Sequence, residues 1–381
     1  MEKQVVRYYQ LEGTYEEMGR QMAKKMAGTK AMEYMVVPPI DRLTRQDIED
    51  ALTLYQTYCP GLVEELTGFS KESGIPVENI AFIWMSYLVP GCSSLIVSGK
   101  KSTDGHTKIY RNYEFSIEDE DLAVCRTVPK GKYAHVSGTI AVFGRCEGIN
   151  ECGLAVSMSS CGFPVSNLEG MRPPKVKGLQ FWAVNRTLLE NCKNTEEALS
   201  LLKDLPIGFN VNLYLADETG NTILFETMDG KKAWKCQTMK EDATCLCGTN
   251  HIVIPEFRSN EPVGMSNSIV RYKALHSFAE SKKQLSEHEV KQFMLTEYPT
   301  GMTTHFYEDW FGTIKTVVLD TVERRFSICW LGEAENGFID FYVDQEITDQ
   351  TEDMLYHNQS ADPGLFELIP IEEVCVVKDR K

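Results

Sequence analysis

A glycine and a cysteine stand at an abrupt change of pattern in this 381-residue chain. The helix-like stretch 77–88 ends at a Pro-Gly break, and Cys92 follows Gly91 directly and opens an apolar β-type run. A cysteine thiolate is a strong nucleophile. Hydrolysis of the Gly91–Cys92 peptide bond would also give Cys92 a free α-amine, a base with a reference pKa of about 8. One residue would then supply both nucleophile and base.

Charged and amide side chains follow on the next β-type run, over residues 107–115. This run carries Arg111, Asn112 and Glu114. A guanidinium beside a thiol favours the thiolate. The pattern therefore predicts a nucleophile at the first position of a strand, with its supporting side chains on the returning strand. The alternative is that Cys92 is a buried structural thiol and that Arg111 and Glu114 form an ordinary ion pair.

The elements that must position these side chains change in kind along the chain. Residues 1–91 are expected to be mainly helical, beginning with a capping box at Thr14 and Glu17. From Cys92 onwards, strand-like runs alternate with helices, and 338–343 is expected to be the last strand. This order predicts an α+β fold in which two antiparallel sheets lie between helical layers.

Composition excludes several classes of partner. The formal net charge of −16 argues against binding to nucleic acid or to anionic membranes. No apolar run reaches the roughly 18 residues that span a bilayer, and the N-terminus lacks the apolar core of a secretory signal. The 12 cysteines then indicate free thiols in a reducing, cytoplasmic setting.

The sequence predicts no cofactor and no metal. Cys245 and Cys247 form the single close cysteine pair, and no second pair completes a zinc site. No glycine-rich phosphate loop and no basic cluster for a diphosphate are evident. One alternative function remains for the pair, a redox-sensing thiol protein that uses Cys245 and Cys247.

Several short motifs, taken in order, resemble those of the penicillin acyltransferase family, the isopenicillin-N acyltransferase-like, self-cleaving N-terminal nucleophile (Ntn) hydrolases. They are the segments 11–21, 91–94, 104–106, 111–115, 148–154, 249–251 and 267–272. The bile salt hydrolases are a more distant branch that normally lacks a long helical propeptide. The resemblance implies a four-layer αββα Ntn-hydrolase sandwich. Residues 1–91 would form a helical propeptide packed on the core, and 92–381 the catalytic chain.

The resemblance also implies roles for individual residues. Cys92 would be the nucleophile both of self-cleavage at the Gly91–Cys92 bond and of catalysis. Asn250 matches the oxyanion-hole amide, and Arg111 would favour the thiolate. Glu114 stands where the family usually has Asp, and would orient the α-amine. Two further residues match a Ser-x-x-Arg motif near the site, Ser268 and Arg271.

The function implied is cleavage of a linear C–N amide bond in a small molecule, or transfer of its acyl group, through a thioester on Cys92. Hydrolysis is favoured because the sequence shows no coenzyme A site. The cleaved chains would stay associated as a heterodimer, and the sequence leaves open whether homo-oligomers form. One alternative is a conjugated bile acid or N-acyl amino acid hydrolase. Another, kept open by Glu114, is a non-cleaving inactive relative that acts as a binding protein.

Overall fold

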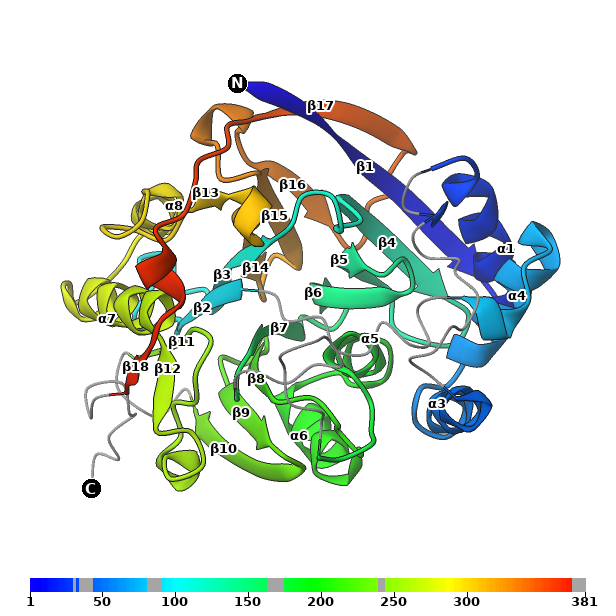
Figure 1. Cartoon of the computed structure of the whole chain (residues 1–381), viewed down its shortest axis with the longest axis horizontal. Coiled ribbons are helices and arrows are strands. Elements are labelled where there is room, and N and C mark those ends of the chain that lie inside the picture. Colours follow the sequence, from blue (N-terminus) through cyan, green and yellow to red (C-terminus); the bar gives the residue numbers. More distant parts are fainter. Residues whose placement is uncertain (30–31, 34–43, 81–90, 163–174, 239–243, 372–381) are drawn as a thin grey trace.

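Two β-sheets pack face to face and carry helices on their outer sides (Figure 1). The computed structural model describes residues 1–29, 32–33, 44–80, 91–162, 175–238 and 244–371. The sheets touch through strands β2, β3, β14 and β15 on one side and β6, β7 and β8 on the other. Helix α5 covers the outer face of one sheet through β6 and β7, whereas α7 and α8 cover the other through β2 and β3. The predicted αββα sandwich is therefore confirmed.

The larger sheet has nine strands in the described part of the chain. Their spatial order is β10 (Lys231–Gln237), β9 (Thr222–Met228), β8 (Val211–Ala216), β7 (Ala155–Ser160), β6 (Gly144–Asn150), β5 (His135–Ile140), β4 (Ala123–Pro129), β1 (Glu2–Gly13) and β17 (Gln350–Tyr356).

The smaller sheet contains the candidate nucleophile. Its strands follow the order β11 (Cys245–Gly248), β2 (Gly91–Val97), β3 (Lys108–Phe115), β14 (Phe311–Asp320), β15 (Arg325–Trp330) and β16 (Ile339–Tyr342), and β13 (His305–Phe306) pairs with β14. A separate short pair joins β12 (Val263–Met265) to β18 (Leu368–Pro370). The strands β17 and β18 come after residue 343, so the prediction that 338–343 is the last strand is wrong.

The helices of the described part of the chain have the following bounds. They are α1 (Tyr15–Met26), α3 (Arg45–Tyr58), α4 (Leu62–Ser73), α5 (Phe181–Asn191), α6 (Thr195–Asp204), α7 (Ser266–Glu280) and α8 (Glu287–Leu295). The capping box of Thr14 and Glu17 is present at α1. Most of the predicted helix over 77–88 lies outside the described residues, which show a 3-10 turn at Val77–Asn79.

The expectation of a mainly helical N-terminal segment is wrong for residues 2–13. They form β1, which pairs antiparallel with β17 and parallel with β4. The β1–β4 pair also departs from the prediction of purely antiparallel sheets. Both partners of β1 lie more than a hundred residues away in sequence. A local pattern carries no information about such partners, and tertiary pairing decides the strand.

Helices α1 and α4 cross so closely that glycine is required at the contact. A Cβ on Gly68 would lie 2.1 Å from the backbone oxygen of Glu16. A backbone atom cannot rotate away, so we expect Gly68→Ala to lower the free energy of unfolding by about 1–3 kcal/mol. Urea unfolding measures this, with Gly364→Ala as control because its nearest neighbour is a side-chain oxygen at 3.3 Å. Equal midpoints for wild type and Gly68→Ala would contradict the close crossing.

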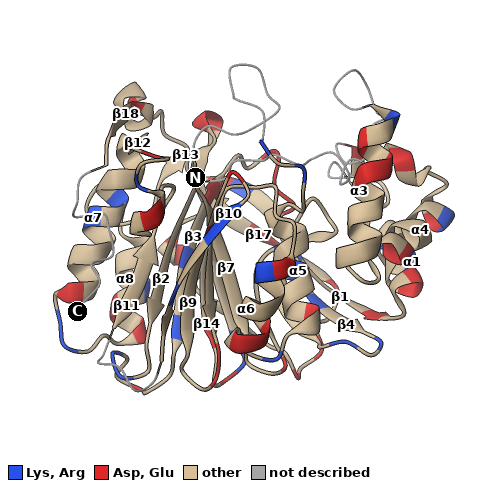
Figure 2. Ribbon diagram, turned by 90° about the horizontal axis from the view of Figure 1, so that it is seen from below, with Lys and Arg blue, Asp and Glu red and all other residues tan. Residues whose placement is uncertain are grey.

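Acidic residues outnumber basic ones on the outer helices α3 and α4, in keeping with the negative net charge (Figure 2). Within the described ranges, no helix has both the length and the apolar character needed to cross a membrane.

Candidate active site

Strand register brings the candidate nucleophile and its neighbours together. Gly91 pairs with Glu114 and Cys92 with Tyr113 across β2 and β3. On the other side of β2, Gly248 pairs with Ser94. An antiparallel ladder continued two residues beyond β11 places Asn250 opposite Cys92.

The two faces of β2 carry different chemistry, because side chains alternate along a strand. The Cys92 face looks into the space between the sheets, where Ser94 Oγ lies 3.1 Å from Ser157 Oγ on β7. The opposite face meets the helical layer, where Ser93 Oγ accepts a hydrogen bond from Arg271 of α7 (2.8 Å). The thiol is thus held between the sheets and its main chain is held from the helices.

Arg111 lies against the thiol. Its Nη2 donates to Cys92 Sγ (3.1 Å) and to the Met158 sulfur (3.3 Å). Burial raises the pKa of Cys92 to about 11, although the charge of Arg111 acts in the opposite direction. In the uncut chain the thiol is therefore mainly protonated at neutral pH, and a base is needed to activate it.

Asn250 holds the backbone nitrogen of Cys92. Its Oδ1 accepts a hydrogen bond from the Cys92 N–H (3.1 Å) and another from Arg271 Nη2 (2.7 Å). Its Nδ2 donates to the backbone oxygen and to the hydroxyl of Ser160, both at 3.2 Å. The side-chain amide thus presents its oxygen to the nitrogen of the Gly91–Cys92 bond and its N–H groups to the end of β7.

Arg271 connects the remaining polar groups of the site. Its Nη1 donates to the Cys92 carbonyl (2.8 Å) and lies 3.4 Å from Glu114 Oε2. Glu114 is fully buried, and burial raises its pKa to about 7 even though Arg271 and Arg111 favour the carboxylate. Glu114 therefore titrates near neutral pH, as a general base does.

Ser268 and Asn112 lie farther from Cys92 and contact the residues around it. Ser268 Oγ accepts from the Asn250 backbone N–H (2.9 Å) and lies 2.8 Å from His251 Nδ1. Burial lowers the pKa of His251 to about 3, so this imidazole is neutral at pH 7. Asn112 turns to the helical layer, where its Nδ2 donates to the Met294 carbonyl (2.9 Å). All the predicted site residues thus lie around Cys92, and the segment 81–90 that precedes them lies outside the described residues.

A family model decides the relationship that the motifs suggested. The model described as acyl-coenzyme A:6-aminopenicillanic acid acyl-transferase matches residues 101–335, more than half of the chain. The chain belongs to this family. The predicted membership is confirmed, and the matched range begins after Cys92, so the cleavage site itself lies outside it. A comparison with curated proteins found no match.

Solved structures resemble this acyl-transferase family member only distantly. A mutant of conjugated bile acid hydrolase from Clostridium perfringens is 12% identical with a TM-score of 0.44, covering 71% of this chain and 98% of that one. A Caenorhabditis elegans orthologue of N-acylethanolamine-hydrolyzing acid amidase is 14% identical with a TM-score of 0.41 (61% and 93% covered). Penicillin V acylase from Agrobacterium tumefaciens is 18% identical with a TM-score of 0.32 (65% and 76% covered).

The candidate site contains a buried array of charged side chains that the sequence analysis did not predict. Arg111 forms an ion pair with Glu147 of β6, and Lys315 of β14 lies 3.3 Å from Glu147 and 3.4 Å from Glu120. A Cβ on Gly138 would lie 2.0 Å from Glu147 Oε1, so glycine leaves room for the array. The available signal was a charged residue inside an apolar strand pattern, as in Lys315 within Phe311–Asp320.

The loop after Asn250 rests on two buried carboxylates that the sequence analysis also missed. Glu226 accepts hydrogen bonds from the backbone N–H groups of Val253 (2.7 Å) and Ile254 (3.0 Å). Glu261 accepts from the N–H of Ile252 (2.6 Å). Burial nevertheless raises the pKa of Glu226 to about 8.

Glu226 makes stability depend on pH. Its folded pKa of about 8 lies above the unfolded value of roughly 4.3, so the folded state binds more protons between these values. The contribution of Glu226 to the free energy of unfolding is fully present below about pH 4 and is lost as pH rises through 8. Between these values the free energy of unfolding falls by about 1.4 kcal/mol per pH unit. We expect the free energy of unfolding of Glu226→Gln, measured with urea, to fall less steeply than that of the wild type between about pH 5 and pH 8. Exposed Glu64→Gln is the control, and equal slopes for Glu226→Gln and wild type would contradict this assignment.

Proposed function

We propose that this chain is a self-processing cysteine amidase or acyltransferase. It would cut its own Gly91–Cys92 bond and then cleave a linear amide of a small molecule through a thioester on Cys92. Membership of an acyl-transferase family supports acyl chemistry. Hydrolysis of the thioester by water is proposed ahead of transfer to an amine, because water is always available as an acceptor.

One observation carries the proposal: long-range polar partners hold the sulfur, the nitrogen and the carbonyl oxygen of Cys92. These partners are Arg111, Asn250 and Arg271. The backbone N–H and C=O of any buried residue need partners, but a structural cysteine behaves as a small hydrophobe and needs no arginine at its sulfur. Side chains from three distant segments therefore fix the position of Cys92, as expected for a reactive residue.

Self-cleavage would begin at the thiol. Cys92 Sγ loses its proton and attacks the Gly91 carbonyl carbon, so an S–C bond forms while the C–N bond to Cys92 breaks. The departing nitrogen takes up the proton and becomes the α-amine. Water then hydrolyses the thioester, leaving a carboxylate on Gly91 and a free thiol on Cys92. Glu114, paired in register with Gly91 and titrating near neutral pH, is the group we assign as proton carrier.

The mature site would use the same contacts for a substrate amide. The α-amine replaces the peptide N–H that now donates to Asn250, and acts as base for the thiol. The thiolate attacks the substrate carbonyl, the amine leaves with a proton, and water releases the acid from the thioester. Asn250 Nδ2 and a backbone N–H at the end of β7 are the proposed donors to the oxyanion.

Residues 1–91 would stay bound after cleavage. Strand β1 lies between β4 and β17 and is hydrogen-bonded along both edges. Arg186 of α5 also forms a buried ion pair with Glu65 of α4. The cleaved product is therefore proposed to be a heterodimer of residues 1–91 and 92–381 that separates only on unfolding.

Intact mass of the purified protein tests the proposal. Two chains, 1–91 and 92–381, that co-elute in native buffer and separate in denaturant are the expected result. Reaction of one cysteine per protein with an electrophilic amide analogue, located at Cys92 by peptide mapping, would then establish the mature nucleophile. A single chain of 43.2 kDa without a reactive Cys92 would contradict the proposal and favour a binding protein.

A further inference from the structure

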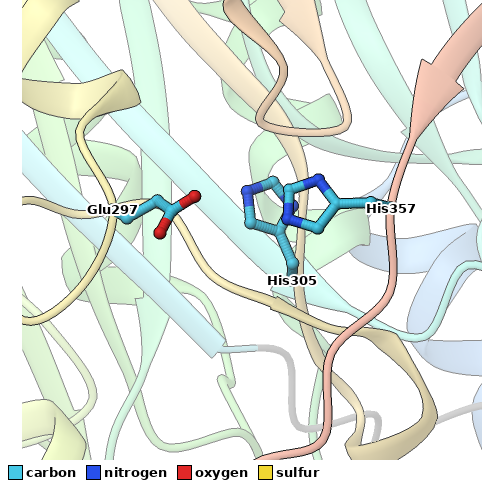
Figure 3. A group of neighbouring side chains, drawn as sticks. All are labelled: Glu297, His305 and His357. Carbon is cyan, nitrogen blue, oxygen red and sulfur yellow. The ribbon is translucent and has the colours of Figure 1, made fainter. Parts of the chain in front are cut away.

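Three potential metal ligands from distant segments lie together on the far side of β14 from β3. They are Glu297, in the connection after α8, His305 on β13, and His357, directly after β17 (Figure 3). Each offers one ligand atom, and these atoms all lie within 4.8 Å of one another. Figure 3 shows the Glu297 carboxylate pointing towards the two imidazole rings.

The two imidazoles are in contact, and a ring nitrogen of one of them has no hydrogen-bond partner within the described part of the chain. The ring centroids of His305 and His357 are 3.8 Å apart. His305 is 3% exposed, and its Nδ1 makes no hydrogen bond to any described residue, with Glu333 Oε1 3.9 Å away. A buried polar atom without a partner is costly, so its presence needs a reason.

His357 is oriented as a ligand is. Its Nδ1 lies 2.5 Å from Glu333 Oε1, and its Nε2 lies 3.0 Å from Nε2 of the exposed Gln359. A proton on Nδ1 shared with Glu333 leaves the lone pair of Nε2 as the acceptor for Gln359, and a metal ion would take the place of this exposed donor. Carboxylates fix the tautomer and ring orientation of metal-binding histidines in this way.

A second group of similar composition serves as a contrast. Asp104, His106 and Asp320 also lie within 4.8 Å of one another. Their carboxylates already have cationic partners, because Lys108 pairs with Asp104 and with Asp320 (3.5 Å), and Arg325 lies 3.7 Å from Asp320. By contrast, neither Glu297 nor Glu333 forms an ion pair with a lysine or arginine among the described residues. The carboxylates around His305 and His357 therefore have no lysine or arginine partner there.

We propose that Glu297, His305 and His357 bind one divalent transition-metal ion, of which Zn²⁺ is the best fit, with Glu333 holding His357. Two imidazoles and one carboxylate are a common zinc ligand set. Tetrahedral zinc brings its ligand atoms to roughly 3.3 Å from one another. To reach this spacing, the exposed Glu297 side chain would have to rotate towards the imidazoles. The proposal differs from the prediction of no metal. That prediction was based on ligand spacing along the chain, and these three residues form no spacing motif.

The ion would fasten the C-terminal segment beside the active site. Gln359 N already donates to the His305 carbonyl (2.8 Å). Further along the same segment, the Leu365 carbonyl accepts from Asn267 Nδ2 (2.6 Å), and Asn267 Oδ1 accepts from Arg271 (2.8 Å). The metal is therefore assigned a structural role, which is to hold this segment in place, and it would take no part in bond breaking.

Titration of the metal-free full chain with Zn²⁺ tests the site. One Zn²⁺ per chain with a dissociation constant in the micromolar range or below is expected, and so is a rise of the thermal midpoint with added Zn²⁺. The variants His357→Gln and Glu297→Gln change side chains near the surface, so the fold is retained. Each should weaken binding at least about a hundredfold, and Glu333→Gln by about 10–100-fold.

The matched control is His106→Gln, because the carboxylates of its group are already paired with Lys108. This variant should bind Zn²⁺ as the wild type does. The visible spectrum of the Co²⁺ form distinguishes histidine and carboxylate ligands from the chain's thiols. Binding left unchanged by His357→Gln, thiolate charge-transfer bands, or no uptake at about 100 μM Zn²⁺ would each overturn the proposal. The Zn²⁺ titration measures binding whether or not the chain cuts itself, which separates this test from that of the proposed function.

Discussion

Cys92→Ala should leave one uncut chain of 43.2 kDa with no amide-cleaving activity. The substitution removes the sulfur that forms the S–C bond, and loss of a hydrolase nucleophile lowers kcat by about 10⁶-fold. The fold should survive, because only one buried heavy atom is lost, at a cost of about 1 kcal/mol. Intact mass and urea unfolding, measured side by side, check both statements.

Cys92→Ser is the companion variant. A hydroxyl can carry out the same acyl shift but is a weaker nucleophile than a thiol, so cleavage should continue slowly. The expected order of cleavage rates is therefore Cys, then Ser, with none for Ala. Cleavage of the Ala variant at the same bond would show that a contaminating protease makes the cut, and the Ntn mechanism would fall.

Arg111→Met should abolish efficient processing and destabilise the fold. The guanidinium donates to Cys92 Sγ and pairs with Glu147, and both arginine and glutamate are buried. Removing one member of a buried ion pair costs about 3–5 kcal/mol because the other charge is left uncompensated. The thiol also loses the cation that opposes the burial-driven rise of its pKa, so cleavage and alkylation of Cys92 should slow by about 10²–10³-fold.

The double variant Arg111→Met/Glu147→Gln separates these two effects. It removes both charges of the pair, so most of the stability should return while cleavage stays slow. The control Arg186→Met breaks another buried ion pair, that with Glu65, and should destabilise without a comparable loss of thiol reactivity. Recovery of cleavage together with stability in the double variant would reduce Arg111 to a packing role.

Local chemistry made much of the chain predictable. The capping box at Thr14 and Glu17 fixes the start of α1, because the cap contacts lie within four residues. The strands Val211–Ala216 and Thr222–Met228 pair across a short turn, and the Gly91-Cys92 break starts β2. Together with the family motifs, these local signals were enough to collect Cys92, Arg111, Glu114, Asn250, Ser268 and Arg271 into one site.

Tertiary structure decided what depends on partners distant in sequence. Residues 2–13 are a strand because β4 and β17 bind both of their edges. Lys315 and Glu147 are buried beside Arg111 because two sheets close over them, and burial, absent from a linear pattern, sets the pKa values of Cys92 and Glu114. The Glu297, His305 and His357 group likewise arises only where three segments meet. Sequence spacing predicts contacts within a helix turn or a hairpin. The pKa values of buried groups and the meeting of possible metal ligands depend on contacts between residues farther apart in the chain.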